Sequence, residues 1–244
     1  MITGFYFKGF YYKKYKRIYS DNISKMISIL MPIYNGIEFI EGSVSSVLNQ
    51  TFTEWELIIG INGYSPNSET YKIAKTYEVK SNKIRVYDLI DARGKSNALN
   101  HMLQYCSYDY VALLDVDDIW LDNKLQTQFI YCFVYDVIGS QCVYFGSMDG
   151  ITPRIPLDDF SDFDFSLYNP IINSSVIIRK DLCNWLSNDG VEDYELWLTL
   201  RKQGKRFYNC SDILVKHRIH QKSAFNTQDH SKLINKLIEK YRST

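Results

Sequence analysis

The chain has 244 residues and equal numbers of acidic and basic side chains, so its formal net charge is zero. A neutral chain of ordinary apolar content (45%) has no overall field for nucleic acid, and it is long enough to bury a core of its own. Its five cysteines include no C-x-x-C pair, which argues against a disulfide scaffold or a zinc site and favours reduced thiols. We therefore expect a cytoplasmic protein that does not bind nucleic acid.

The first segment, residues 5–20, mixes aromatic and basic side chains in the stretch FYFKGFYYKKYKRIYS. Lysines interrupt it too often for a signal peptide. Two interpretations stay open: a tail or strand that packs locally, or a peripheral contact with membrane headgroups. The longest apolar run, FIYCFVY at 129–135, is far too short to span a bilayer and indicates a buried helix before a strand.

From Ile27 onward, short apolar runs alternate with segments of helical periodicity. The runs predict strands at 27–34, 55–61, 83–90 and 110–114. The periodic segments predict helices at 38–50, 68–79, 94–106 and 121–135. Such alternation implies right-handed βαβ units, and the continuous apolar strands indicate a mostly parallel sheet that helices cover on both faces.

The second half of the chain is less regular. Residues 153–170 are acidic and rich in turn residues, which predicts a loop. Further patterns predict strands at 171–179, 205–209 and 213–219, a helix at 192–204, and an amphipathic terminal helix at 233–241. Because no Gly-, Pro- or Ser-rich linker and no repeat interrupts the chain, we expect one compact domain.

A buried strand runs directly into an acidic cluster in VALLDVDDIW, where Asp115, Asp117 and Asp118 follow the apolar residues. Carboxylates this close repel one another and resist leaving water. Mg²⁺ and Mn²⁺ prefer carboxylate oxygens and share them with substrate phosphates, and ligands bind at the carboxyl ends of parallel strands. The alternative is an Asp-rich turn that caps the next helix. His220, far along the chain, is either a solvated loop histidine or a further ligand.

Two predicted helices begin with charged residues. Gly94 and Lys95, with Arg93 before them, suit contact with a diphosphate, because helix N-termini favour anions; an ordinary helix cap is the alternative. Glu192 and Asp193 open a later helix. They either complement the helix dipole or provide a general base for an attacking hydroxyl.

Five stretches follow one another in a distinctive order. They are ISILMPIYNGIEFIEGSVSSVLNQTFTEWELII (27–59), ARGKSNALN (92–100), ALLDVDDIWLDNKL (112–125), EDYELWLTLRKQG (192–204) and HRIH (217–220). In this order and spacing they resemble the family 2 glycosyltransferases, which have the GT-A fold, a Rossmann-like α/β architecture. The resemblance implies transfer of a sugar from a nucleotide-diphosphate donor to a hydroxyl of a glycan, lipid-linked or protein acceptor, generally with inversion.

The resemblance also assigns roles to individual residues. Asp115 and Asp117 match the D-x-D motif, which meets the ribose and a Mn²⁺ or Mg²⁺ ion; Asp118 is a further candidate ligand. His220 matches a late histidine that reaches the metal or the diphosphate. The ion would stabilise the departing diphosphate as a Lewis acid.

The remaining roles concern the base and the donor. Asp193 matches the general base, and Glu192 assists it or stabilises the helix. The resemblance implies a donor-binding set of Pro32, Tyr34, Asn35, Arg93 and Lys95, with the first three around the nucleoside and the last two facing the phosphates.

One departure from the family pattern lies after the second strand. The family usually carries Asp-Asp-Gly-Ser there, whereas this chain has Ile61-Asn62-Gly63-Tyr64 with Asn62 at the second Asp position. The amide oxygen of Asn62 can still accept a hydrogen bond from a uracil imino group, without charge assistance. A UDP-sugar is therefore the favoured donor.

The expected division of the chain has three parts. Residues 1–26 form an N-terminal extension, 27–220 form the catalytic domain, and 221–244 form a C-terminal helix. Within the domain, 27–125 bind the nucleotide sugar and 126–220 form the acceptor side. The pattern does not specify the oligomeric state.

Other functions stay open. The missing Asp-Asp-Gly-Ser motivates a sugar-nucleotide-binding protein without transferase activity. A nucleotidyltransferase would use the same carboxylate chemistry, but the chain lacks its usual Gly-rich basic first loop. A phosphatase would carry D-x-D after the first strand, whereas here it follows the fourth.

Overall fold

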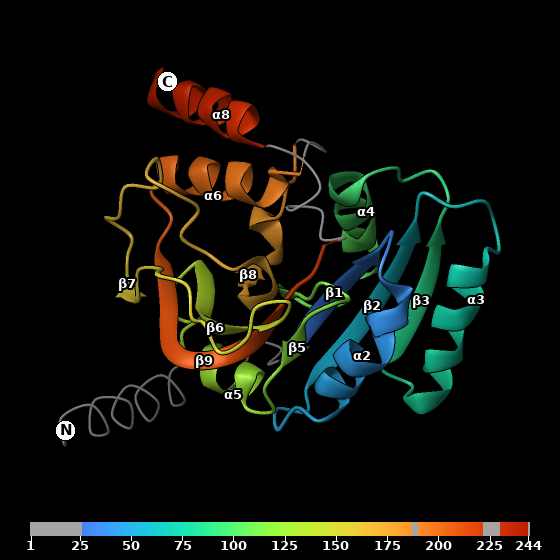
Figure 1. The fold of residues 1–244 in the computed structure, drawn as a ribbon. Helices are drawn as coiled ribbons and strands as arrows, with labels where there is room; N and C mark the ends of the chain where they lie inside the picture. The colour runs from blue at the N-terminus through green and yellow to red at the C-terminus, as the bar shows by residue number, and fades with distance from the viewer. Residues whose placement is uncertain (1–25, 187–189, 222–229, 244) are drawn as a thin grey trace.

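The computed structural model describes residues 26–186, 190–221 and 230–243. They form a central, strongly curved sheet with helices on both faces (Figure 1). The predicted α/β fold with a covered sheet is therefore confirmed. The predicted N-terminal extension lies outside the described residues apart from Met26.

The sheet has nine strands in the described part of the chain. They are β1 (Ile27–Ile33), β2 (Trp55–Asn62), β3 (Ile84–Leu89), β4 (Tyr110–Leu113), β5 (Ile119–Trp120), β6 (Val137–Gly146), β7 (Asp158–Asp159), β8 (Ile177–Arg179) and β9 (Phe207–Ile219). The order is β3-β2-β1-β4-β8-β6-β9-β5, with β7 paired to β9. Strands β1 to β4 are parallel, as the βαβ pattern predicts, whereas β8 runs antiparallel to both of its neighbours.

The helices connect these strands and cover them. The α-helices are α2 (Ile40–Leu48), α3 (Glu69–Lys75), α4 (Lys95–Met102), α5 (Lys124–Phe129), α6 (Glu192–Lys202) and α8 (Ser231–Ser243). Short 3-10 turns are η1 (Ile37–Phe39), η2 (Thr76–Lys80), η3 (Leu103–Tyr105), η4 (Asn173–Ser175) and η5 (Lys180–Leu182). None of the helices in the described ranges combines the length and the apolar character that a transmembrane span requires.

Three predicted elements differ from the structure. The helix expected over 121–135 is shorter: α5 ends at Phe129, and turns occupy the residues after it. The strand expected over 171–179 is reduced to β8, because the 3-10 turn η4 occupies its first part. The strands expected at 205–209 and 213–219 are one continuous strand, β9, which pairs with β6 through two register shifts.

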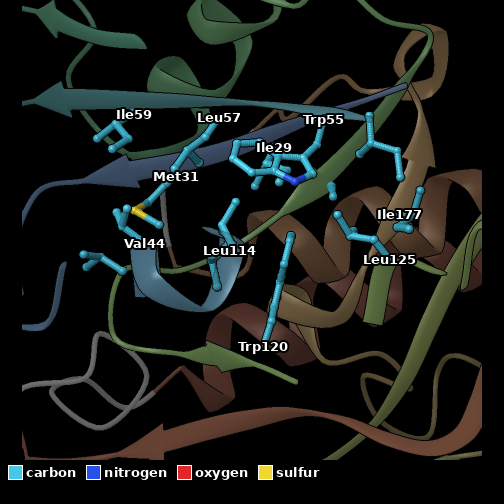
Figure 2. Packing of buried hydrophobic residues seen from close by; sticks show 14 of the residues in the cluster. Ile29, Met31, Val44, Trp55, Leu57, Ile59, Leu114, Trp120, Leu125 and Ile177 are labelled. Carbon is cyan, nitrogen blue, oxygen red and sulfur yellow. The ribbon is translucent and has the colours of Figure 1, made fainter. Parts of the chain in front are cut away.

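Alternate residues of the central strands supply two separate cores. Ile29 and Met31 of β1 face α2, α3 and α5, whereas Leu30 between them faces α4 and α6. Figure 2 shows the first core, where side chains of β1 and β2 meet Val44 of α2. A sheet buried on both faces needs apolar side chains at every position, which explains the unbroken runs of the sequence.

The terminal helix α8 lies against α6 on the side away from the sheet (Figure 1). Ile234, Leu237 and Tyr241 of α8 pack against the second core. The Lys240 ammonium lies 2.9 Å from Glu195 Oε1 of α6. The amphipathic pattern at 233–241 is thus explained by packing on α6, and the helix extends two residues beyond it at each end.

A glycine in β6 makes room for a buried asparagine of β9. Gly139 pairs with Asn209, whose fully buried side chain occupies the space beside it. The Asn209 amide donates hydrogen bonds of 2.8 and 3.0 Å to the carbonyls of Pro156 and Pro170. Asn209 therefore anchors both ends of the loop that the sequence predicted at 153–170.

We predict that Gly139→Ala destabilises the protein by about 1–3 kcal/mol. The added methyl group would overlap Asn209 Oδ1 and approach Ser175 Oγ to 3.2 Å, so Asn209 would have to leave its two carbonyl partners. Urea unfolding measures the change in free energy. In the control Gly42→Ala, the methyl group meets Ile119 at an ordinary 3.7 Å within α2, so a gain of about 0.5–1 kcal/mol is expected. Equal stabilities of the two variants would contradict the packing argument.

Candidate active site

The acidic cluster lies at the carboxyl end of β4, where the structure also brings the starts of α4 and α6. The Leu114 amide still donates to Leu30 of β1, and the chain then turns through Asp115 to Asp118. Asp118 N donates to Asp115 O across this turn at 3.1 Å. The cluster thus sits on the edge of the parallel sheet where ligands bind in α/β proteins.

Asp115 is held by donors from two segments, α4 and the 3-10 turn η4. Its carboxylate lies 2.6 Å from Lys95 Nζ of α4, and it accepts hydrogen bonds from Asn173 Nδ2 at 3.1 Å and Ser174 Oγ at 3.3 Å. Burial alone would raise the pKa of Asp115, but the Lys95 ammonium and the Asn173 amide outweigh it and keep that pKa below its ordinary value. Asp115 is therefore ionised at neutral pH.

Lys95 links the acidic cluster to the start of α6. Gly94, the residue before it, has φ of 83°, a conformation that glycine adopts without strain. Burial would lower the pKa of Lys95, but the charges of Asp115, Glu192 and Asp193 raise it above its ordinary value. One ammonium group thus neutralises carboxylates from both halves of the site.

Asp117 and His220 form the second contact of the site. Asp117 Oδ2 lies 2.9 Å from His220 Nε2. Burial and then the charges of Asp118 and Asp115 raise the pKa of Asp117. The structure therefore joins the predicted D-x-D motif to the predicted late histidine, which is 103 residues away in sequence.

Asp118 is completely buried and holds the end of β9. One oxygen accepts from the Arg218 backbone amide at 2.8 Å, and the other lies 2.9 Å from His217 Nδ1. Burial would lower the pKa of His217, but Asp118 outweighs it and raises that pKa to about 9. Arg218 Nε also donates to the Asp117 carbonyl at 2.9 Å. Both oxygens of this predicted metal ligand already have protein partners.

Asp193 lies in the first turn of α6. Its Oδ1 accepts from the Tyr194 amide at 2.7 Å, and its Oδ2 accepts from Asn169 Nδ2 at 3.1 Å. Burial and the neighbouring charge of Glu192 raise the pKa of Asp193 to about 6, although Lys95 opposes the shift. A carboxylate with a pKa close to neutral is suited to accept a proton.

The predicted nucleoside residues lie on the loops after β1 and β2. The Tyr64 hydroxyl donates to the Tyr34 carbonyl and ties these loops together. Tyr34 is 58% exposed, and its ring leaves no room for a side chain at Gly63. Asn62 is buried at the end of β2, while Pro32, the last residue but one of β1, pairs with Gly60 of β2.

Two predicted residues stand apart from this network. Asn35 and Arg93 are both exposed, Asn35 in the loop after β1 and Arg93 in the loop before α4. The Arg93 carbonyl accepts a hydrogen bond of 2.8 Å from Asn97, so its backbone is fixed while its side chain faces outward.

Sequence reasoning missed the residues that hold these carboxylates in place. They are Asn169, Asn173, Ser174, His217 and Arg218. The first three lie in or beside an irregular loop with no period to interpret. His217 belongs to the same HRIH stretch as His220, so the sequence offered it as a candidate. The spacing alone does not distinguish the roles of the two histidines.

The donor set suits a hard divalent cation in part. Within the described residues, no group of three His, Cys, Asp or Glu side chains converges well enough to hold an ion without further ligands. Asp117 and His220 nevertheless offer an oxygen and a nitrogen side by side. Burial and then the charges of Asp118 and Asp115 raise the pKa of Asp117, and a cation would relieve the repulsion between these carboxylates. Mn²⁺ and Mg²⁺ commonly complete such sites with substrate phosphates and water.

Comparison with curated proteins gives several relatives over most of the chain. A glucosyltransferase of Escherichia coli, named UDP-Glc:alpha-D-GlcNAc-diphosphoundecaprenol beta-1,3-glucosyltransferase WfgD, is 31% identical over 207 residues, which cover 81% of this chain and 79% of WfgD. The putative teichuronic acid biosynthesis glycosyltransferase TuaG of Bacillus subtilis is 30% identical over 209 residues, 81% of each chain.

Solved structures share the fold at low sequence identity. A TarS fragment of S. aureus, residues 1–349 in complex with UDP-GlcNAc, aligns with a TM-score of 0.71 and 15% identity, over 88% of this chain and 66% of that fragment. The mannosyltransferase PcManGT of Pyrobaculum calidifontis, in complex with GDP-Man and Mn²⁺, aligns with a TM-score of 0.63 and 13% identity, over 88% of this chain and 65% of PcManGT. The chain thus spans just under two thirds of the length of these two solved chains.

The family model described as glycosyl transferase family 2 matches residues 28–193, from the first strand to the acidic pair of α6. This range includes the acidic cluster and Asp193, although not the histidines of β9. The chain belongs to glycosyl transferase family 2 and is a glycosyltransferase with the GT-A fold.

Proposed function

We propose that this glycosyltransferase is a metal-dependent, inverting enzyme that moves a sugar from a UDP-sugar to a hydroxyl acceptor, with Asp193 as general base. The observation that carries the proposal is the contrast between two carboxylates of one site. Asp115 is held ionised by Lys95, whereas the pKa of Asp193 is raised to about 6. Carboxylates with different pKa values in one site suit different tasks.

The base acts on the acceptor. Asp193 takes the proton of the acceptor hydroxyl as that oxygen attacks the anomeric carbon from the face opposite the diphosphate, which inverts the configuration. Asn169 and the Tyr194 amide orient the carboxylate. Glu192 is buried beside it, and the repulsion between the two carboxylates raises the pKa of Asp193.

We predict that Asp193→Asn lowers the rate of sugar transfer by about 10²–10⁴-fold, since the amide cannot accept the proton. Nucleotide-sugar binding, measured by calorimetry, should stay within about twofold because the side chain faces the acceptor and not the donor. Donor hydrolysis gives a readout that needs no known acceptor. Glu192→Gln is the matched control and should retain more activity.

Normal turnover by Asp193→Asn would contradict the assignment of the base. Donor binding by the native chain without transfer or hydrolysis would instead favour a sugar-nucleotide-binding protein, the alternative that the sequence left open.

We predict that kcat falls about tenfold per pH unit below pH 6, because Asp193 must be deprotonated to act as base. Asn169→Ala removes a hydrogen bond to the carboxylate that lowers this pKa, so the acidic limb of the profile should move to higher pH. The rate–pH profile under saturating substrates measures both effects. A limb that stays in place in Asn169→Ala would contradict the link between Asn169 and the base.

For the donor, we propose that Lys95 and Arg93 face the diphosphate and that Asp117 and His220 hold Mn²⁺ or Mg²⁺. When bound, such an ion supplies Lewis-acid stabilisation of the leaving diphosphate. Asp115 then contacts the ribose while Lys95 fixes its orientation. The support is the pairing of Asp117 with His220 and the mannosyltransferase neighbour that binds GDP-Man with Mn²⁺. Asp118 is better assigned to holding β9, since His217 and Arg218 use both of its oxygens.

We predict that Asp117→Asn and His220→Gln each weaken nucleoside-diphosphate binding in Mn²⁺ by at least about tenfold, through loss of a metal ligand. Calorimetry with UDP and GDP, in Mn²⁺ and in EDTA, measures the effect. Asp212→Asn, a charge change in the exposed part of β9, is the control and should bind as the native chain does. If the native chain binds nucleoside diphosphates equally well in Mn²⁺ and in EDTA, the metal assignment is contradicted.

The same calorimetric titration with UDP and GDP also identifies the preferred nucleotide. We propose that Asn62 accepts a hydrogen bond from the uracil imino group and that Pro32, Tyr34 and Asn35 enclose the nucleoside. The support is the buried position of Asn62 at the end of β2, beside loops that Tyr64 ties together. Tighter binding of GDP than of UDP would contradict the proposal that the site recognises uracil.

For the acceptor, we propose a lipid-linked saccharide. The support is the relative WfgD, whose name gives a GlcNAc-diphosphoundecaprenol acceptor and which matches this chain over most of both lengths. The acceptor side would be formed by the described parts of residues 126–220, around Asn169 and Asp193.

A further inference from the structure

We infer that the outer face of α8 is a docking surface for an anionic membrane. The chain as a whole is neutral, but α8 carries four basic side chains against a single acidic one, Glu239. Lys232, Lys236 and Lys240 follow one another at intervals of four residues, so they form one ridge along the helix. This concentration of positive charge complements the negative surface of an anionic leaflet.

The position of α8 leaves Lys232 and Lys236 of this ridge turned away from the protein. Ile234, Leu237 and Tyr241 bury the opposite side of the helix against the second core, and α6 lies between α8 and the sheet (Figure 1). Lys232 and Lys236 are exposed, and Lys240 remains 66% exposed although it reaches Glu195. The lysines can therefore contact a membrane while the apolar side chains of α8 stay packed against the protein.

Exposed apolar side chains lie on α8 itself and next to the residue that Arg242 contacts. Leu233, next to Lys232, is 36% exposed. Arg242 at the end of α8 donates to Ser166 Oγ at 2.8 Å, and the two residues after Ser166, Leu167 and Tyr168, are 63% and 43% exposed.

Another exposed leucine lies close in sequence to the residue that contacts the start of the helix. Gly190 lies against the ring of His230, the residue before α8. Leu186, four positions before Gly190, is 60% exposed. Exposed leucine and tyrosine beside lysine is the composition that suits the boundary between headgroups and acyl chains. An acidic protein surface would match the lysines but would leave these apolar side chains unexplained.

The docking surface lies beside the base. Tyr168 precedes Asn169, which donates to Asp193, and α8 packs on the first turns of α6, where Asp193 lies. Contact with a leaflet through α8 would bring Asp193 close to the headgroup region. A lipid-linked acceptor, as proposed above, would present its sugar at that level. The docking itself does not depend on transfer activity.

The test is sedimentation with sucrose-loaded vesicles that contain no saccharide lipid. At low salt, the native chain should bind to vesicles of equal parts phosphatidylglycerol and phosphatidylcholine. It should bind much less to vesicles of phosphatidylcholine alone. Lys232→Gln with Lys236→Gln should lower the partition coefficient by about tenfold or more. Lys72→Gln with Lys216→Gln changes the net charge equally on α3 and β9 and should bind as the native chain does.

Two further variants measure what the exposed leucines and the N-terminal lysines each contribute to vesicle binding. Leu167→Ser with Leu186→Ser should weaken binding at every salt concentration, because apolar contacts are not screened. Lys13→Gln with Lys14→Gln tests the basic N-terminal segment. Unchanged urea midpoints show that each variant is folded.

The inference is overturned if the native chain fails to bind anionic vesicles or binds neutral ones equally. It is also overturned if the α8 lysine variant binds like the native chain, or if only the N-terminal variant loses binding. Unchanged binding of the leucine variant would remove Leu167 and Leu186 from the surface. None of these outcomes bears on the proposed transfer reaction, whose failure would appear in the hydrolysis and calorimetry experiments.

Discussion

The active site depends on one ammonium group placed among carboxylates. Lys95 contacts Asp115 at 2.6 Å, and its charge also acts on Asp193 at the start of α6. Each of these carboxylates would resist ionisation if it were buried alone. Because Lys95 lies closest to Asp115, that residue stays ionised, whereas Asp193 keeps a pKa near 6. Lys95 at the start of α4, together with the burial of Asp193 beside Glu192, therefore sets the electrostatic difference between the two halves of the site.

The first half of the chain forms the floor of the site and the second half holds its side chains in place. Strands β1, β2 and β4 bring Pro32, Asn62 and Asp115 to one edge of the parallel sheet. Asp118 then pairs with β9 through His217 and the Arg218 amide. This contact needs the antiparallel pairing of β5 with β9, which sets the end of β9 beside the acidic turn. The mixed part of the sheet thus serves to position the histidines.

The sequence predicted what depends on local pattern. The parallel strands, the acidic edge and the first turn of α6 follow from apolar runs and helix periodicity. It did not predict the end of α5, since an apolar run such as FIYCFVY satisfies a helix and a packed turn equally. In the structure, Tyr131 leaves the helix and stacks on Tyr208 of β9, with ring centroids 4.1 Å apart. Nor could spacing pair Asp118 with His217, because a strand pairing 99 residues apart decides it.

The segment 169–175 has a consequence for how the site works as a unit. Asn169 donates to Asp193, and Asn173 and Ser174 donate to Asp115, so only three residues lie between the support of the proposed base and those of the acidic cluster. The segment is itself fixed at Pro170 by the buried Asn209 and at Ser174, whose carbonyl accepts from Trp120 Nε1 at 2.7 Å. A shift of this segment would disturb the hydrogen bonds of both carboxylates at once. The structure therefore connects the proposed general base to the acidic cluster through a few loop residues that carry no recognisable motif.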